Sequence, residues 1–538
     1  MAETAIAPKA NNYSKLPRKQ VILTMAGVML ALFLASLDQT IVGTALPRII
    51  ADLGGFSQYT WVLTSYLIAT TVTVLIAGKL SDLFGRKWIL MSAIVIFITG
   101  SILCGVSATL NQLIIFRGIQ GIGAGAIMGL TFIIIGDLFP PTERGKYAGF
   151  LSGVFGISSI IGPTLGGFIT DNLSWNWIFF INVPLGILIV ILFIFFFPNL
   201  RPDLIKPKVD YLGIATMALT VVPLMLALSL GGVNYEWSSP LIIGMLILSF
   251  VMLFVFLRVE SRASEPILPL WLFKNNIVTI SSIIVFIMGF SLFSAIVFVP
   301  LFFQGVLGST ATASGTLLTP MMLGMVVGAI LSGQLLSRTG GHYRIQGAIG
   351  IIIMVIGIFL LSTMTVETSN TAAIRNIVIT GLGLGTTMPL YLIAVQNAVS
   401  HSILGVATST NAFFRTIGGT LGLAVVGSIM NNTFLSRVTE NVSPEILQKI
   451  PAEQMNALTE NPQALVNPDA LVQLQTVFEG MGEQGITLFN SLIITLREAL
   501  SSAIGQVFLV LFFFVLGALV LSFFIKQIPL RKHQGEND

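Results

Sequence analysis

The chain has 538 residues, of which 54% are hydrophobic and 9% are charged, and its formal net charge is +4. Soluble domains carry roughly 25% charged residues, so this composition excludes a water-soluble monomer. The small net charge excludes a polybasic surface for nucleic acid, and the single cysteine, Cys104, excludes an internal disulfide or a cysteine-rich zinc site.

The long apolar segments predict membrane-spanning helices. A helix crosses about 30 Å of hydrocarbon with roughly 20 apolar residues, whereas the strands of a membrane barrel are about 10 residues long and alternate in polarity. We therefore predict an all-α membrane protein with fourteen transmembrane helices. In chain order they are 21–46, 60–78, 89–108, 112–134, 146–169, 176–197, 211–230, 240–257, 277–303, 313–335, 346–364, 372–396, 404–430 and 499–525.

The basic residues are distributed as this topology requires. If both termini are cytoplasmic, 20 of the 27 Lys and Arg residues fall in cytoplasmic segments and five in outer segments. Missing or adding one helix would destroy this alternation, because cytoplasmic loops carry the excess of positive charge. The pattern predicts a multi-pass protein of the cell (cytoplasmic) membrane with both termini in the cytoplasm.

The spans divide the chain into two similar halves. Gly78 to Gly85 ends the second span and Gly333 to Gly340 ends the tenth, and both segments read G-x-L-x-x-x-x-G before a short basic turn. Such repeats are typical of transporter halves. The predicted units are a cytoplasmic tail 1–20, a six-helix bundle 21–197, a linker 198–276 with two additional helices, a six-helix bundle 277–525 and a cytoplasmic tail 526–538.

One segment is long enough for a separate extramembrane unit, the extracellular loop 431–498, which carries eight acidic and three basic residues. Asn467-Pro468-Asp469 predicts the start of a short helix with Phe478 on its apolar face. Residues 486–496 are apolar but too short to span, so they either lie at the outer interface or lengthen the final helix. The alternative to a separate unit is that the whole loop is a variable surface insertion.

Motifs for phosphate or metal chemistry are absent from the sequence. The chain has no G-x-x-x-x-G-K-[ST], H-E-x-x-H or G-x-S-x-G segment, and its three histidines, His342, His401 and His533, are far apart. An ATP-driven motor, a metalloenzyme and a serine hydrolase would each need such a motif. We therefore expect no enzyme activity, no cofactor and no ATP.

Two ionisable residues of opposite charge lie inside spans of the first half. Asp38 is roughly 12 Å from the outer end of the first span, and Arg117 is roughly 8 Å deep in the fourth, at 1.5 Å per residue. Charges at membrane depth are costly and commonly functional. The pair is either a proton switch, reached by water from alternate sides, or a permanent strut that orients two helices.

A third charge, Arg415, lies at mid-depth in the thirteenth span, with no acid in its own half of the membrane. Backbone carbonyls, water or a substrate group must satisfy it. We predict that it lines the substrate cavity together with Asn411, Tyr66 and Tyr391. Glycines cluster beside Arg117, beside Arg415 and in the fifth span, where they allow either close helix packing or hinge motion.

Four motifs together resemble those of the major facilitator superfamily, specifically its fourteen-span drug:proton antiporter branch. The resemblance covers about residues 20–430 and the last helix. The motif between the second and third helices matches Gly78 to Lys87, and the first-helix signature is similar to Leu37 to Val42 with Ala45 to Pro47. The fourth-helix motif is similar to Leu113 to Arg117 with Gln120, Gly121 and Gly123. The fifth-helix antiporter motif is similar to Gly156 with Gly162, Pro163, Gly166 and Gly167.

The resemblance implies a role for each matching residue. Asp38 would be the proton-coupling acid, and Arg117 its electrostatic partner. Asp82 would face the amino end of the thirteenth helix, and Arg86 would pair with Asp137 to hold the cytoplasmic side closed. The implied latch comprises Gly78, Asp82, Gly85, Arg86, Lys87 and Asp137, and the implied hinge comprises Gly156, Gly162, Pro163, Gly166 and Gly167. In the second repeat Ser337 stands at the position that corresponds to Asp82, so we expect any latch there to be weaker.

The resemblance also implies a major facilitator fold, with two six-helix bundles plus two extra central helices. We predict a proton-coupled antiporter, active as a monomer, that exports lipophilic, often cationic, drugs or toxic compounds by alternating access. A fourteen-span exporter of lipids or lipid-like metabolites would share every motif. A nutrient symporter fits the Gly162-Pro163 region less well, and a receptor would need a sizeable domain outside the membrane.

Overall fold

A computed structural model describes residues 17–53, 59–198, 208–232, 235–308, 311–442, 475–476, 478–479 and 482–530. These residues form helices and no strand, apart from one isolated bridge between Gly231 and Tyr235. The long helices are α1 Arg18–Leu53, α2 Tyr59–Phe84, α3 Arg86–Gly105, α4 Leu110–Leu138, α5 Pro141–Asn172, α7 Asn182–Phe196, α8 Tyr211–Leu230, α9 Pro240–Glu260, α10 Asn276–Leu301, α11 Ala311–Thr339, α12 Tyr343–Ser362, α13 Asn370–Ala398, α14 Leu404–Asn441 and α18 Glu483–Ser522. Short helical segments are α6 Trp177–Phe180, η3 Leu270–Lys274, η4 Phe302–Val306 and η5 His401–Ile403.

The described residues contain 14 helical segments long and apolar enough to cross a membrane, which confirms the predicted number. Helices suit this environment because they satisfy every backbone hydrogen bond within the segment. Polar side chains start several of them where the apolar run begins. The Thr109, Asp210, Ser239 and Ser369 side chains each accept a hydrogen bond from a backbone N–H of the first turn.

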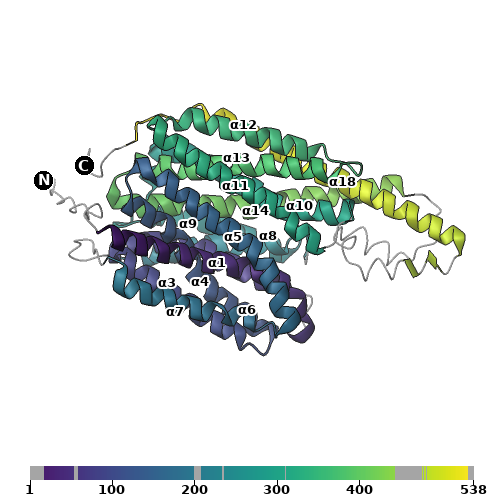
Figure 1. Ribbon diagram of the computed structural model, residues 1–538, viewed down its shortest axis with the longest axis horizontal. Helices are drawn as coiled ribbons and strands as arrows, with labels where there is room; N and C mark the ends of the chain where they lie inside the picture. Colours follow the sequence, from purple (N-terminus) through teal and green to yellow (C-terminus); the bar gives the residue numbers. More distant parts are fainter. Residues whose placement is uncertain are drawn as a thin grey trace.

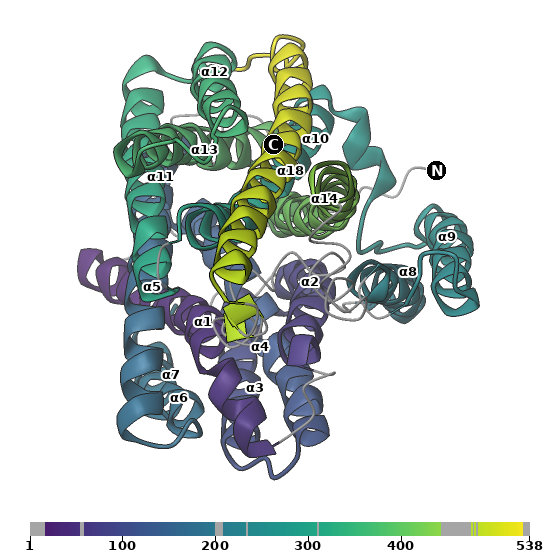
Figure 2. The ribbon, with the colours of Figure 1, turned by 90° about the vertical axis from the view of Figure 1, so that its right-hand side faces the viewer.

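The helices form two bundles that repeat the same packing. Figure 2 looks along the bundles and shows α1–α7 on one side and α10–α14 with α18 on the other. In the first bundle α4 packs between α2 and α3, and in the second α13 packs between α11 and α12. The repeat predicted from the two G-x-L-x-x-x-x-G segments therefore corresponds to two equivalent bundles.

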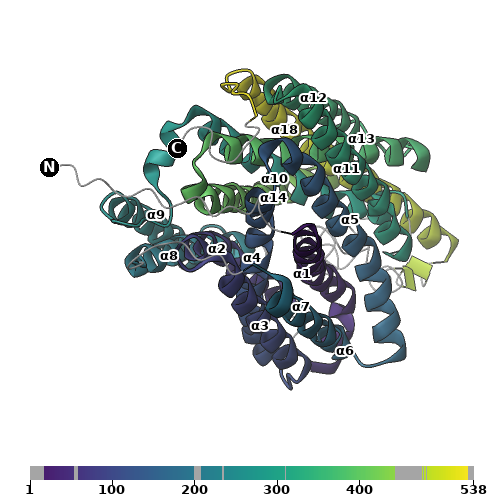
Figure 3. The ribbon, with the colours of Figure 1, turned by 60° about the vertical axis from the view of Figure 1, so that its left-hand side comes forward.

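The additional pair, α8 and α9, is central in the sequence but lies at the edge of the molecule (Figure 3). It contacts α2 of the first bundle and α14 of the second. Met217 and Val221 of α8 are buried in a cluster with Leu75 of α2 and Phe413 of α14. The pair thus covers one seam between the bundles, and its outer helix α9 exposes apolar side chains such as Phe250, which is 62% exposed.

The two longest helices, α14 with 38 residues and α18 with 40, are much longer than a membrane requires. At 1.5 Å per residue, α18, with 40 residues, is roughly 60 Å long, about twice the hydrocarbon thickness. It extends beyond the other helices in Figure 1. Residues 431–441 and 483–498 of the predicted extracellular loop are helical continuations of α14 and α18. Phe434 and Leu492 of these segments are buried in the apolar core, and α14 packs against α18. The predicted helix start at Asn467 lies outside the described residues.

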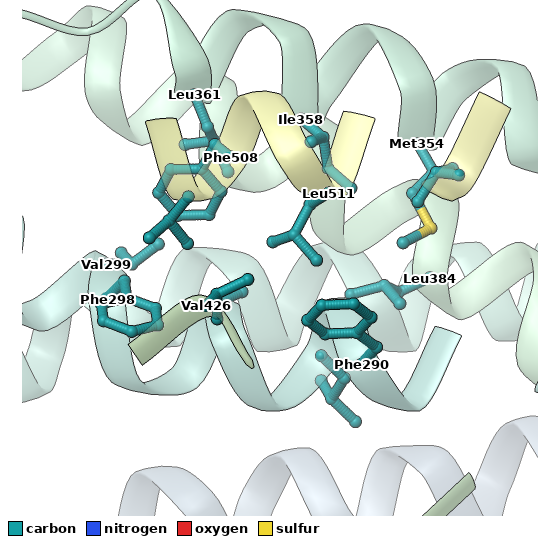
Figure 4. Close-up of a cluster of buried hydrophobic side chains, with 14 of the residues drawn as sticks. Phe290, Phe298, Val299, Met354, Ile358, Leu361, Leu384, Val426, Phe508 and Leu511 are labelled. Carbon is teal, nitrogen blue, oxygen red and sulfur yellow. The ribbon is translucent and has the colours of Figure 1, made fainter. Parts of the chain in front are cut away.

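The apolar core of the second bundle joins five helices around α18. Figure 4 shows Phe508 and Leu511 of α18 among side chains from α10, α12, α13 and α14. Large apolar side chains also cover the outside, for example Phe195 at 73% and Phe513 at 61% exposure. Such a surface fits a lipid solvent and would be unusual in water.

The bundles contact each other closely near the end where α1 begins and α18 ends, which we call the terminal end. Gly78 of α2 packs against Gly405 and Ser409 of α14, and Gly333 of α11 packs against Gly145 of α5. A Cβ on Gly145 would lie 2.7 Å from the Gly333 Cα. The first glycine of each repeat therefore lies at an equivalent contact between the bundles.

Candidate functional site

Asp38 and Arg117, which the sequence places at similar depth, form an ion pair inside the first bundle. The Arg117 Nη1 lies 2.7 Å from the Asp38 Oδ2, and both side chains are 0% exposed. Asp38 comes from α1 and Arg117 from α4, so the pair joins two helices that are far apart in the sequence. Breaking one partner would leave a charge in a medium that solvates it poorly.

Three further side chains complete this site, which we call the Asp38 cluster: Asp38, Arg117, Gln120, Asn182 and Ser101. Gln120 Nε2 donates to Asp38 Oδ1 at 2.7 Å, and its Oε1 accepts from Arg117 Nη1 at 2.7 Å. Asn182 Nδ2 donates to the same Asp38 oxygen at 2.9 Å. Asp38 therefore accepts three hydrogen bonds, which stabilise its charged form.

Asn182 and Ser101 were not identified from the sequence. The Ser101 hydroxyl accepts from Gln120 at 3.2 Å and from Asn182 at 3.0 Å, and it donates to the Phe179 carbonyl at 2.8 Å. Asn182 is the first residue of α7 and follows Ile181. An asparagine at the start of a helix is common, so its position alone does not indicate a binding role. The one available signal was that it is a polar residue inside a predicted span.

Tyr66, predicted as a cavity residue, packs against Arg117. Its ring centroid lies 4.1 Å from the guanidinium carbon, and its hydroxyl donates to the Ala35 carbonyl at 3.3 Å. Tyr66 is 1% exposed. A cation over an aromatic face is attracted by the ring, and the ring also shields the ion pair from water.

The glycines of the fourth-helix motif explain how Arg117 reaches this position. A Cβ on Gly121 would lie 2.6 Å from the Tyr66 carbonyl oxygen of α2. A Cβ on Gly123 would lie 2.5 Å from the Phe97 nitrogen of α3. Only glycine lets α4 approach both neighbours this closely. The motif therefore fixes α4 against α2 and α3 and so holds Arg117 and Gln120 in register with Asp38.

The acids and the arginine of the predicted latch meet at the terminal end. Arg86 lies 2.5 Å from Asp82 and 2.8 Å from Asp137, and it also donates to the Ser81 hydroxyl at 2.5 Å. Asp82 accepts from the backbone N–H of Val406 at 3.0 Å. Because Val406 lies in the first turn of α14, the carboxylate is stabilised by a helix amino end in the other bundle.

A histidine adds a second connection between the bundles. His401 Nε2, in η5 just before α14, lies 3.2 Å from the Asp137 Oδ1. Asp82 thus contacts the first turn of α14, and Asp137 contacts η5 just before it. His401 was not predicted as part of this site, because it is separated from the latch by more than 260 residues.

Other latch positions have different roles. Gly85 has φ +91°, a left-handed conformation that lets the chain turn directly from α2 into α3. Lys87 Nζ donates to the carbonyls of Ile194 and Phe197, both at 3.0 Å, so it caps the carboxyl end of α7 within its own bundle. Lys87 is therefore placed away from the contact between the bundles.

The repeat in the second bundle has no comparable ion pairs among its described residues. Gly340 has φ +72° and ends α11, as Gly85 ends α2. In place of the charged contacts, Gln346 Nε2 donates to the carbonyl and the hydroxyl of Ser332, at 2.5 and 2.9 Å. These neutral hydrogen bonds lie within the second bundle, between α11 and α12.

The five residues of the predicted hinge belong to one continuous helix, α5, which has Pro163 in its interior. Gly162 and Gly166 pack against Thr40 and Thr44 of α1. Gly156 faces the other bundle, where its Cβ would lie 2.8 Å from Val326. A Cβ on Gly167 would meet nothing within 4 Å. The glycines of this motif therefore lie in three different environments: against α1, against the other bundle, and in open space.

Tyr391, another predicted cavity residue, is 0% exposed. A Cβ on Gly347 of α12 would lie 2.6 Å from its hydroxyl oxygen, so the ring lies between α13 and α12. Asn411 is 5% exposed and precedes the half-buried Arg415 by one helical turn of α14. Of the four predicted cavity residues, the structure brings only these two together.

The fold and these motifs agree with comparisons to known proteins. The model of the Major Facilitator Superfamily matches residues 28–210 and 208–423. The multidrug transporter protein MdtP of Bacillus subtilis is 39% identical over 540 residues, covering 98% of this chain and 97% of that protein. Multidrug resistance protein 3 of the same organism is 42% identical over 417 residues, covering 78% of this chain and 81% of that protein.

Among solved structures, the human organic anion transporter MFSD10 (TETRAN) has the same fold. It superposes with a TM-score of 0.57 at 13% identity, and the match covers 93% of this chain and all of that one. At this identity the likeness concerns the fold alone. The chain belongs to the major facilitator superfamily and is a multi-pass membrane transporter rather than an enzyme.

Proposed function

We propose that this transporter exports small lipophilic compounds, drugs and toxic compounds among them, in exchange for protons. The observation that carries the proposal is Asp38, a carboxylate 0% exposed inside the first bundle and 2.7 Å from Arg117. Two relatives named as multidrug proteins support drugs as cargo, because their similarity extends over most of each chain.

The Asp38 cluster can link a proton to a movement of helices. A proton on Asp38 would remove the negative charge that attracts Arg117 and would weaken the carboxyl oxygen that accepts from Gln120 and Asn182. These donors come from α4 and α7, whereas Asp38 is on α1. Protonation would therefore loosen α1 from its neighbours, and a rearrangement of α1 would in turn change whether the carboxylate holds its proton.

We propose that the terminal end faces the cytoplasm, which agrees with the excess of basic residues in the segments predicted to lie there. The contacts of Arg86, Asp82 and Asp137 hold this end closed, so the described arrangement would be open to the outside during transport. One charge crossing 100 mV is worth about 2.3 kcal/mol, which supports roughly a 50-fold concentration gradient per net charge.

The test is transport by the purified chain in proteoliposomes with an imposed pH difference. Wild type is expected to move a lipophilic dye against its gradient when protons can flow in exchange. Asp38→Asn should abolish this movement, because an amide cannot carry the proton. The matched control is Asp52→Asn on the same helix, where the exposed carboxylate only accepts from Trp175 at 3.0 Å. Proton-driven movement retained by Asp38→Asn would refute the proposal.

A further inference from the structure

Arg415 lies on the face of α14 that is directed into the molecule. Residues 408, 411, 415, 418 and 422 share this face, because their spacing of three and four matches the helical repeat. Toward the terminal end, Thr408 accepts from Gln396 of α13 at 3.1 Å. Beyond Arg415, Gly418 and Gly422 pack against Phe286 and Phe290 of α10. The backbone of α14 at Arg415 thus packs against α10 inside the molecule.

The guanidinium of Arg415 has no partner in the described part of the chain. No carboxylate there lies within 4.0 Å of it, and it forms neither a hydrogen bond nor a contact with an aromatic face. Arg117, inside the first bundle, is by contrast paired with Asp38 and bonded to Gln120. A cation held inside a membrane protein without a counter-ion commonly marks a functional site.

A second donor without a partner lies one turn away. Asn411 is 5% exposed, and its side-chain nitrogen makes no hydrogen bond within the described residues. Buried amide donors are nearly always bonded, so this nitrogen requires an acceptor that the described residues do not provide. Asn411 and Arg415 are four residues apart and on the same face of α14, which lets one ligand reach both.

The neighbourhood is otherwise apolar. Gly289 of α10 packs against the backbone of Arg415, and the half-buried ring of Phe293 packs against Gly419, one helical turn beyond Arg415. Two donors, one of them cationic, one helical turn from an aromatic ring fit a molecule with an anionic group and an apolar body. A cationic compound would instead meet the uncompensated charge of Arg415, which repels it.

We propose that Arg415 and Asn411 bind the anionic group of amphiphilic substrates, a carboxylate, sulfonate or phosphate, and that this exporter selects such anions over cations of the same shape. This inference rests on the proposed function, because it treats the bound molecule as a transported substrate. The binding site itself does not depend on proton coupling. It also departs from the cationic substrates that the sequence motifs imply.

Binding is tested with three probes that share one ring system: 1-pyrenesulfonate, the neutral 1-pyrenemethanol and (1-pyrenylmethyl)trimethylammonium. Fluorescence anisotropy of the full chain in an uncharged detergent gives the affinity of each. Wild type should bind the sulfonate most tightly. Arg415→Gln should weaken sulfonate binding about tenfold or more, as expected for a lost hydrogen bond to a charged group, and leave the neutral probe unchanged.

Two variants act as controls. Arg375→Gln removes an exposed arginine of the neighbouring helix α13 and should change none of the affinities. Asn411→Asp keeps Arg415 but gives it a carboxylate four residues away, so it should lower sulfonate affinity even if Arg415→Gln fails to fold. Equal binding of the three probes by wild type, or unaltered sulfonate binding by both Arg415→Gln and Asn411→Asp, would overturn the inference.

An anionic lipid headgroup offers the same chemistry as a soluble anion. Phosphatidylglycerol added to the detergent should compete with 1-pyrenesulfonate in proportion to its amount if a lipid is the natural occupant, and should have no effect if the site takes soluble amphiphiles. Efflux of 1-pyrenemethanol driven by a pH difference separates this inference from the proposed function. If wild type shows no such efflux but still binds the sulfonate in an Arg415-dependent way, proton coupling is refuted and the binding site is not.

Discussion

Asp38 is bound by groups from three directions, and this explains how a charge persists inside an apolar bundle. Arg117 supplies a counter-ion, while Gln120 and Asn182 supply two neutral donors to the opposite oxygen. Ser101 then holds both amides in place by accepting from each. The carboxylate is 0% exposed in this arrangement, so proton exchange requires at least one of these contacts to open.

Asn182→Ala should destabilise the folded protein through Asp38. Removing the donor leaves one carboxylate oxygen with a single hydrogen bond, which costs about 1 to 2 kcal/mol in a membrane protein. Thermal unfolding in detergent measures the change. The matched control is Asn172→Ala, whose amide only donates to the Phe168 carbonyl of its own helix at 2.9 Å.

A double-mutant cycle shows whether the effect acts through the acid. In an Asp38→Asn background the acceptor is neutral, so the cost of Asn182→Ala should fall by at least about 0.5 kcal/mol. Strictly additive changes would mean that Asn182 stabilises the bundle independently of Asp38.

The residues of this site differ in how far the sequence reveals them. Asp38 and Arg117 are recognisable because charges inside apolar spans are rare, and Gln120 follows Arg117 within one motif. Asn182 and Ser101 are ordinary polar residues near or inside apolar runs. Their role depends on which faces of α3 and α7 meet α1 and α4, and single-helix periodicity does not determine this packing.

At the scale of elements, Arg86 and Lys87 form a natural pair for comparison. They are adjacent in sequence, but Arg86 contacts two acids that touch α14 or η5 just before it, whereas Lys87 caps α7 in its own bundle. Sequence motifs group them together because their side chains have the same charge. Both residues begin α3, where successive side chains point about 100° apart around the helix axis.

Arg86→Ala should shift the protein toward the state in which the terminal end is open. Two acids would lose their shared cation, so we expect the ratio of open to closed molecules to rise at least about tenfold, or about 1.4 kcal/mol. Spin labels at Glu143 of α5 and Arg338 of α11, both exposed, report the distance. Lys87→Ala should leave the distance distribution unchanged, and equal shifts for both variants would contradict this role of the latch.

The glycines of α5 should also separate into two classes. Gly166→Val should destabilise the protein, because its Cβ would lie 2.9 Å from the Ile41 carbonyl of α1 and force the helices apart. Gly167→Val places its side chain in open space and should change the melting temperature little. Circular dichroism during heating compares them. Equal losses of stability would indicate a backbone role for both positions instead of a packing role for one.

At the scale of the whole molecule, the number of spans and the two bundles could be predicted because length, apolarity and charge alternation are local properties. The edge position of α8 and α9 could not, since it depends on side chains such as Met217 and Phe413 that meet only in the folded chain. The ion pair of Lys79 with Glu265, at 2.6 Å, likewise joins α2 to the segment after α9.

The bundles must separate at the terminal end for cargo to enter from that side, and a cross-link there should stop transport. A Cβ on Gly149 of α5 would lie 3.2 Å from the Ile330 Cα of α11, close enough for a disulfide between Gly149→Cys and Ile330→Cys. The only native cysteine, Cys104, is 0% exposed and does not interfere. Oxidation should abolish efflux from the double variant, reduction should restore it, and each single variant should be insensitive to both. Efflux that continues after complete cross-linking would mean that cargo crosses without the two bundles moving apart at this end.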